Sequence, residues 1–237
     1  MDQPCAVVTG GARNIGAAIA LRLQADGFRV IALDVLEPEH DALRADARRV
    51  DLSDRAAAEA AFADIAASFS VAALVNNVGI VRPALFDEVN VDDFEGLMNL
   101  NLRTALIGAK ALVPVMRARG GGRIVMNTSR VTLGKAARTL YSASKGAMQA
   151  MARTWALELG PDRITVNSVA PGPIGTSVFW QNNPPEAART RAIVEAIPVG
   201  RMGIPEDVAH AVSFFCDARS DFITGQTLFV CGGVTVG

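Results

Sequence analysis

The sequence is poor in cysteine, histidine and tyrosine, and these shortages exclude several classes of protein. Its 237 residues include three cysteines, two histidines and a single tyrosine. An odd number of cysteines without a Cys-x-x-Cys pair argues against a disulfide framework, and two histidines leave little from which to build a metal site. We therefore expect no metal ion and a reducing, cytoplasmic location.

The charge balance and the hydropathy pattern exclude further classes. The chain has 23 basic and 24 acidic side chains and a formal net charge of -1, which does not indicate a nucleic-acid-binding protein. The longest stretch without charge, residues 164–185, is interrupted by proline, glycine and asparagine, so it does not resemble a bilayer-spanning helix. The amino-terminal segment lacks the basic and apolar parts of a secretory signal. We expect a small-molecule partner, with no nucleic acid and no membrane.

Short apolar runs alternate with longer alanine-rich amphipathic segments along the whole chain. The runs predict strands at 6–9, 29–33, 48–50, 73–76, 123–127, 165–168 and 227–230, and the segments predict helices at 15–25, 55–68, 92–117, 140–159 and 205–216. Such alternation is typical of βαβ units. We predict an α/β Rossmann fold in one domain, 1–237, whose doubly wound, seven-stranded parallel sheet carries helices on both faces.

A glycine-rich turn follows the first predicted strand and leads into the first helix. Its residues include Gly10, Arg13, Asn14, Ile15 and Gly16. Glycine permits the tight turn and a close backbone approach, and the helix amino terminus attracts a pyrophosphate. An ordinary strand-to-helix turn is the alternative, but the position after the first strand favours a dinucleotide site.

Acidic residues end the second and third predicted strands. Asp34 lies where a carboxylate accepts hydrogen bonds from the adenosine ribose and repels a 2′-phosphate, so we predict NAD as the cofactor. Arg13 favours NADP instead, because a basic loop residue can bind a 2′-phosphate. Asp51 and Leu52 are predicted beside the adenine, although Asp51 could instead cap the helix that begins near Asp54.

Tyr141 lies four residues before Lys145 at the start of a predicted helix, so both side chains lie on one helical face. A nearby cation favours the ionised phenol, and we predict that Lys145 lowers the pKa of Tyr141. The pair is a candidate for proton transfer. Taken alone, it fits equally well with an exposed ring and a solvated ammonium group.

Four motifs in this order give the chain its family resemblance. They are the glycine-rich turn, Asn76-Asn77-Val78-Gly79, Tyr141-x-x-x-Lys145 and the segment from Pro171 to Thr176. The chain resembles the short-chain dehydrogenase/reductase family over essentially its full length, and within it the 3-oxoacyl-carrier-protein-reductase-like branch. It departs from the family pattern at Asn14, Val78 and Cys231. Asparagine tolerates positive φ well, so Asn14 should preserve the turn in place of a glycine.

The resemblance implies a catalytic set and further cofactor contacts. The implied catalytic residues are Asn101, Ser129, Tyr141 and Lys145, with Tyr141 as the acid/base, Ser129 holding the substrate oxygen, Lys145 also bonding the ribose and Asn101 holding a water. The implied cofactor contacts add Asn77, Val78, Gly79, Pro171, Gly172, Ile174 and Thr176. Without the resemblance, Ser129 could be a loop serine that bonds its own backbone, and Asn101 a buried amide.

The resemblance also implies a substrate lid at about 177–198 and a homotetramer built through helices 92–117 and 140–159 and the last strand. Arg82, Arg130 and Arg138 fall near the predicted pocket, where they either recognise a carboxylate or are simply solvated. We predict an NAD-dependent oxidoreductase that interconverts a secondary alcohol and a ketone. The alternatives are an NADPH-dependent 3-oxoacyl-carrier-protein reductase, a sugar-nucleotide epimerase and a non-catalytic dinucleotide sensor.

Overall fold

The computed structural model describes residues 3–236, and at its centre lies one parallel sheet. The order of its seven strands is β3-β2-β1-β4-β5-β6-β7. The strands are β1 (Cys5–Thr9), β2 (Arg29–Asp34), β3 (Arg48–Arg49), β4 (Val71–Asn76), β5 (Gly122–Asn127), β6 (Ile164–Pro171) and β7 (Thr227–Val230). The predicted doubly wound, seven-stranded Rossmann fold is confirmed.

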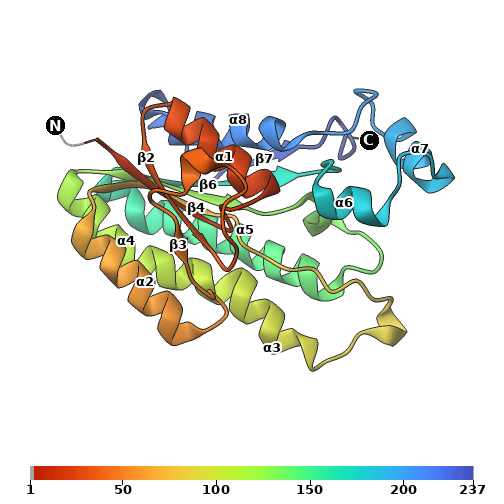
Figure 1. The fold of residues 1–237 in the computed structure, drawn as a ribbon, viewed down its shortest axis with the longest axis horizontal. Helices are drawn as coiled ribbons and strands as arrows, with labels where there is room; N and C mark the ends of the chain where they lie inside the picture. The colour runs from red at the N-terminus through yellow and green to blue at the C-terminus, as the bar shows by residue number, and fades with distance from the viewer. Residues whose placement is uncertain (1–2, 237) are drawn as a thin grey trace.

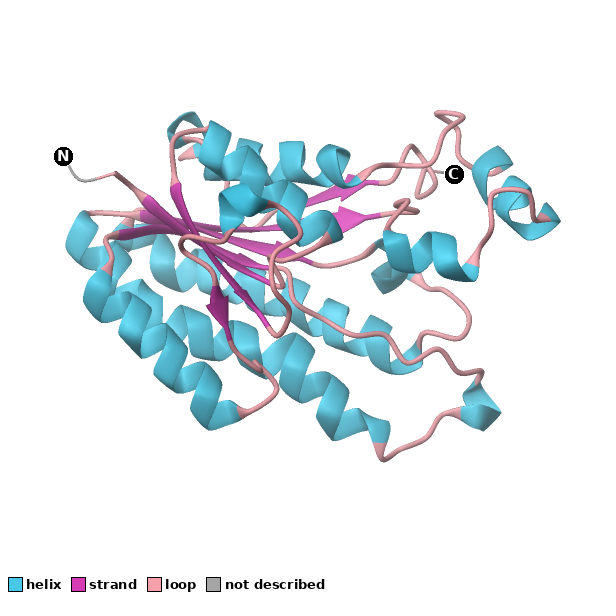
Figure 2. Ribbon diagram, viewed as in Figure 1, coloured by secondary structure: helices cyan, strands magenta, loops and turns pink. Residues whose placement is uncertain are grey.

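Helices cover both faces of the sheet, as Figures 1 and 2 show. On one face lie α1 (Asn14–Ala25) and α8 (Pro205–Cys216), and on the other α2 (Arg55–Ser68), α4 (Thr104–Arg119) and α5 (Thr139–Leu159). Successive strand residues point to opposite faces. Leu74 therefore packs in the core beneath α2, α4 and α5, whereas its neighbours Ala73 and Val75 pack beneath α1 and α8. This double burial explains why the central strands β1 and β4 are apolar up to their last residue.

The chain reverses its direction of winding between β1 and β4. Strands β2 and β3 lie on one side of β1, and β4 to β7 lie on the other. The loops after β1 and β4 therefore meet at the carboxyl ends of the strands, which is where open α/β sheets bind their ligands. Their contact is direct, because Asn77 Nδ2 donates a hydrogen bond of 3.0 Å to the Gly10 carbonyl.

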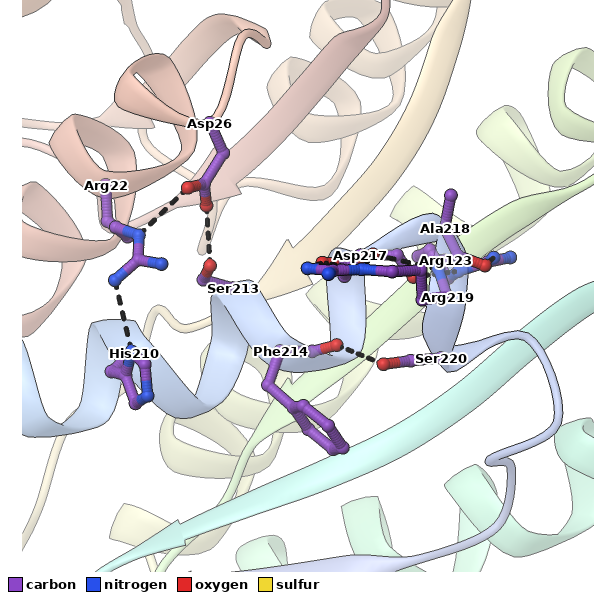
Figure 3. Close-up of polar contacts among 10 residues, drawn as sticks. All are labelled: Arg22, Asp26, Arg123, His210, Ser213, Phe214, Asp217, Ala218, Arg219 and Ser220. Atoms are coloured by element: carbon purple, nitrogen blue, oxygen red, sulfur yellow. Dashed lines mark hydrogen bonds and ion pairs between the residues drawn. The ribbon is translucent and has the colours of Figure 1, made fainter.

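Polar contacts at the amino-terminal end of the sheet hold helices in place (Figure 3). Ser213 Oγ of α8 donates to Asp26 Oδ2 over 2.6 Å, and the same carboxylate pairs with Arg22 of α1. Arg123, near the start of β5, donates to the carbonyls of Asp217 and Ala218 beyond the end of α8. These side chains join α1, α8 and β5, so the polar residues at this end of the sheet hold the helices against it.

Three local differences separate the structure from the sequence prediction. The helix predicted at 92–117 consists of α3 (Asp93–Met98), a π-helical turn (Asn99–Arg103) and α4. The predicted lid contains two helices that we did not predict, α6 (Ser177–Asn182) and α7 (Ala188–Glu195). The third strand is also shorter than predicted, so Asp51 and Leu52 follow β3 instead of closing it. Among residues 3–236, no helix combines the length and the apolar character that crossing a membrane requires.

Candidate active site

The glycine-rich turn after β1 forms a cradle that side chains would fill. Gly10 has a φ of 65°, which favours glycine. A Cβ atom on Gly16 would overlap the carbonyl oxygen of Gly10, and a Cβ on Gly11 would lie 2.9 Å from the Ala32 Cβ. The turn then leads directly into the amino terminus of α1. This arrangement fits a pyrophosphate, because backbone without covering side chains lies next to the amino terminus of α1.

Asn14 keeps the left-handed conformation expected of the glycine it replaces, with a φ of 51°. Its side chain adds a contact that glycine would lack, since Oδ1 accepts a hydrogen bond of 2.8 Å from Ser177 N at the start of α6. The cofactor turn is thus tied to the first lid helix. The next residue, Ile15, packs partly buried against the core beneath α1. On the other side, Arg13 points to Glu39, with 3.5 Å between the charged atoms.

Asp34 lies at the end of β2 with both carboxylate oxygens bonded to backbone. Oδ2 accepts from Ala12 N over 3.0 Å, and Oδ1 accepts from Leu36 N over 3.1 Å. The carboxylate therefore lies against the glycine-rich turn. The side chain of Asp51 bonds Ser53, and Asp54 caps α2, so the capping alternative for Asp51 is wrong. Leu52 packs into the core beneath α2 and α4.

Two polar residues that the sequence analysis missed connect the cofactor turn to the predicted catalytic lysine. Thr9 Oγ1 accepts from the backbone N–H groups of Asn77 and Val78, at 2.9 and 3.1 Å. Asn127 Nδ2 donates to Asn77 Oδ1 over 2.7 Å. The signal was present in the sequence, because Thr9 and Asn127 are each the polar last residue of a strand and directly follow an apolar run.

Lys145 is buried behind this network, with 2% of its surface exposed. Its Nζ donates to the Asn127 carbonyl over 2.8 Å and lies 5.8 Å from the centre of the Tyr141 ring. Burial disfavours the charged ammonium and lowers the pKa of Lys145 to about 8. The structure thus brings the two predicted partners together.

Asn101 lies in the π-helical turn between α3 and α4, a kind of irregularity that is frequent at functional sites. Its side-chain amide forms two hydrogen bonds with the loop after β4: Oδ1 accepts from Ile80 N over 2.8 Å, and Nδ2 donates to Ile80 O over 3.0 Å. Nδ2 also donates to Ser144 Oγ of α5 over 3.1 Å. Gly79 lies between the predicted catalytic groups, since a Cβ there would be 3.1 Å from Asn101 Oδ1 and 3.4 Å from Lys145 Nζ.

Tyr141 and Ser129 complete the group that the sequence predicted. Burial raises the pKa of the Tyr141 phenol above its ordinary value, while a hydrogen bond with Ser129 and the charge of Arg138 act to lower it. The prediction that Lys145 lowers this pKa is therefore wrong for the protein alone, because desolvation outweighs the nearby charges. Ser129 Oγ also accepts from Val131 N over 3.3 Å, so it bonds its own loop as the alternative proposed.

The remaining predicted cofactor contacts lie around the end of β6. Pro171 ends this strand, and Gly172 N donates to the Val230 carbonyl of β7 over 2.9 Å. Ile174 forms an isolated bridge to Gly203. Thr176 caps α6 by accepting from Phe179 N over 3.2 Å. The segment from Pro171 to Thr176 thus leads from the sheet into the lid, beside the turn that holds Asn14.

A parallel sheet with a glycine-rich turn at its reversal point and a Tyr–Lys pair nearby defines a dinucleotide-binding protein of the Rossmann class. A family model described as enoyl-(acyl carrier protein) reductase matches residues 10–235. The chain belongs to the short-chain dehydrogenase/reductase family, an oxidoreductase family, as the resemblance predicted.

Curated and solved relatives span nearly the whole chain. A 3-oxoacyl-[acyl-carrier-protein] reductase of Thermotoga maritima is 33% identical over 100% of this chain and 99% of its own. A 2-dehydro-3-deoxy-D-gluconate 5-dehydrogenase of Escherichia coli is 32% identical over 98% of this chain and 96% of its own. A blue fluorescent protein from a metagenomic library, solved in complex with NADPH, has a TM-score of 0.86 at 32% identity, over 98% of each chain. Together these relatives support a nicotinamide dinucleotide as the cofactor.

Proposed function

We propose that this protein is an NAD(H)-dependent oxidoreductase that interconverts a secondary alcohol and a ketone, with Tyr141 as the acid/base. The observation that carries the proposal is the convergence of Tyr141, Ser129, Lys145 and Asn101 at the carboxyl ends of the strands, next to the glycine-rich turn. We further propose that the chain is one domain, 1–237, in which residues 177–198 form the substrate lid. A cytoplasmic location stays a prediction.

Each predicted catalytic residue has a task that its surroundings support. In alcohol oxidation, the Tyr141 phenolate accepts the hydroxyl proton of the substrate, and Ser129 holds the substrate oxygen. Lys145, fixed by the Asn127 carbonyl, would bond the nicotinamide ribose of a bound cofactor, and in its protonated form it would favour the phenolate. Asn101 positions the loop after β4 through its two bonds to Ile80. In the direction of ketone reduction, the phenol gives its proton back.

The cofactor site that we propose extends from the turn after β1 to the end of β6. When bound, the nicotinamide supplies or accepts the hydride. The proposed contacts are Gly10, Arg13, Asn14, Ile15, Gly16, Asp34, Asp51, Leu52, Asn77, Val78, Gly79, Tyr141, Lys145, Pro171, Gly172, Ile174 and Thr176. The cradle left open by Gly10 and Gly16 supports the pyrophosphate end of this assignment.

Turnover of simple substrates tests the proposed function. A panel of secondary alcohols and ketones, each with NAD(H) and NADP(H) in parallel and followed at the nicotinamide absorbance band, should contain at least one pair that reacts. Binding of either dinucleotide without turnover of any member would support the dinucleotide sensor instead and contradict the proposal.

Asp34 supports the choice of NAD over NADP, and its charge can be removed without changing its shape. The carboxylate is held against the glycine-rich turn by two backbone amides and would repel a 2′-phosphate there. The wild type should therefore have a kcat/KM at least about tenfold higher with NADH than with NADPH, and Asp34→Asn should lose most of that preference. Asp64→Asn, at an exposed carboxylate of α2, is the matched control and should keep it. A wild type that prefers NADPH would overturn the cofactor assignment.

An NADPH-dependent 3-oxoacyl-carrier-protein reductase is the second candidate. Two observations favour it: relatives include such reductases, and the blue fluorescent relative was solved with NADPH. The structure offers two cations for a 2′-phosphate. One is Arg13 in the turn, and the other is Arg49 of β3, which lies opposite Asp34 in the strand register. The same measurement with NADH and NADPH separates the two candidates.

We propose a homotetramer built through α4, α5 and β7, as the family resemblance implies. Large apolar side chains on these elements support it, because Leu106, Leu157 and Leu228 are 44%, 83% and 42% exposed. Light scattering should give a mass of about four chains. Leu157→Glu should give a smaller species, because a charge would have to be buried. A monomeric wild type would contradict this assembly.

A further inference from the structure

The distribution of charge along the chain is uneven around the proposed active site. From residue 96 to residue 157 there is no acidic residue and there are ten basic ones. Five of these basic side chains bond other segments of the chain, among them Arg117 with Asp162, Arg119 with Ser70 and Arg123 with the carbonyls beyond α8. Three others lie between Ser129 and Tyr141, and within residues 3–236 they bond no other segment of the chain.

These three cations frame the proposed catalytic residues. Arg130 directly follows Ser129 and begins a short helical turn, and Arg138 is the residue before α5, one helical turn ahead of Tyr141. Lys135 lies in the loop between them. Arg138 is close enough to influence the ionisation of the Tyr141 phenol. The loop that joins two predicted catalytic residues thus carries three positive charges and no negative one.

A fourth cation comes from the lid. Arg189 of α7 lies near Lys135, together with Arg130 and Arg138. Shielding from water lowers the pKa of the Lys135 ammonium, and the three arginines lower it further, although the residue as a whole is exposed. We call Arg130, Lys135, Arg138 and Arg189 the cationic cluster. Its members come from two segments of the chain and lie together despite their repulsion.

No member of the cationic cluster has an acidic partner among residues 3–236. The nine ion pairs of this part of the chain all involve other arginines. Among residues 3–236, the one side-chain hydrogen bond of the cluster joins Arg138 Nη1 to the neighbouring Ala137 carbonyl, at 2.7 Å. Four like charges without a counterion raise the local potential and attract an anion.

Building on the proposed function, we propose that the cationic cluster binds an anionic group of the substrate, so that the enzyme acts on secondary alcohols or ketones that carry a carboxylate or a phosphate. The anionic group would lie between the loop after Ser129 and the lid helix α7, with the reacting carbon directed towards Tyr141. Because Arg189 belongs to the lid, the substrate's own charge would hold the lid over the site. Charge-assisted hydrogen bonds to such a group are strong and exclude neutral analogues.

Matched substrate pairs test this inference. A series of secondary alcohols with a terminal carboxylate is compared with the corresponding methyl esters, and a second series with a phosphate monoester is compared with the parent alcohols. The wild type should show a kcat/KM about tenfold or more higher for the anionic member of the best pair, and this preference should shrink as salt rises. Lys135→Gln and Arg189→Gln should each lower kcat/KM about tenfold for the anion and leave the neutral member unchanged. Lys110→Gln, at an exposed lysine of α4, is the control.

A second measurement does not depend on turnover. Because the chain has three lysines, NMR of the ¹³C-methylated protein resolves the Lys135 signal from those of Lys110 and Lys145. Inorganic phosphate should raise the pKa of Lys135, whereas that of Lys110 should stay constant and Arg189→Gln should weaken the effect. Equal rates for anionic and neutral members, or no response of Lys135 to phosphate, would overturn the inference. If no pair reacts at all, the proposed function fails, and the phosphate titration alone then decides whether the cluster binds anions.

Discussion

Tyr141→Phe should lower turnover by about three orders of magnitude while dinucleotide affinity stays within about twofold of the wild type. The change removes one hydroxyl and keeps the ring, which lies 5.8 Å from Lys145 Nζ. Steady-state kinetics with a substrate from the panel and fluorescence titration with NADH measure the two effects separately. A variant with wild-type turnover would show that another group moves the proton.

The ionisation of the Tyr141 phenol with pH provides a second, direct test of its role. Tyr141 is the only tyrosine of the chain, so the tyrosinate absorbance band reports this phenol alone, and Tyr141→Phe provides the blank. Because burial raises the pKa of Tyr141, the free protein should ionise above the ordinary range for tyrosine. Alcohol oxidation needs the phenolate, so its rate should rise with pH, whereas ketone reduction needs the phenol and should slow. An unshifted or lowered pKa in the free protein would contradict the burial argument.

Lys145→Met should lower turnover by about a hundredfold or more. It should also raise the free energy of unfolding above that of the wild type, and by more at neutral pH than at alkaline pH. The stability effect follows from the pKa of Lys145, which burial lowers from 10.5 to about 8. Between these values the unfolded chain holds the proton and the folded chain does not, so wild-type stability rises with pH in this window. Below about pH 8 the buried lysine of the folded protein is charged, so the full cost of burying that charge lowers the free energy of unfolding.

The shift corresponds to about 3 kcal/mol, and denaturant unfolding of both proteins at pH 7 and at pH 10.5 measures it. The difference in unfolding free energy between Lys145→Met and the wild type should shrink by about that amount between the two pH values. Comparing the proteins at each pH cancels the contribution of Tyr141, which both retain. A difference that does not change with pH would mean that Lys145 is not buried in solution. Lys110→Met, at an exposed lysine, should show no such trend.

The strands and most helices could be predicted because their signals are local. Each predicted strand matched an observed one to within three residues at either end, since apolar β-branched runs between turns are sufficient to define a buried parallel strand. The left-handed backbone at Asn14 was also predictable, because it depends on the residue type at one position in the turn. The short lid helices α6 and α7 were missed, because proline and polar residues around them obscure the helical pattern.

The sequence by itself determined the order of the elements, the glycine-rich turn after β1 and the spacing of Tyr141 and Lys145, because these depend on neighbours along the chain. Only the tertiary structure decided the backbone geometry at Asn101, the pKa of Tyr141 and the grouping of the cations. The π-helical turn at Asn101 accompanies hydrogen bonds to Ile80, a residue of another segment. Burial by distant elements reverses the expected pKa shift of Tyr141. The cationic cluster likewise exists because folding brings Arg189 of α7 to Lys135, more than fifty residues away. Desolvation and the approach of remote charges are properties of the packed molecule, so no local pattern could reveal them.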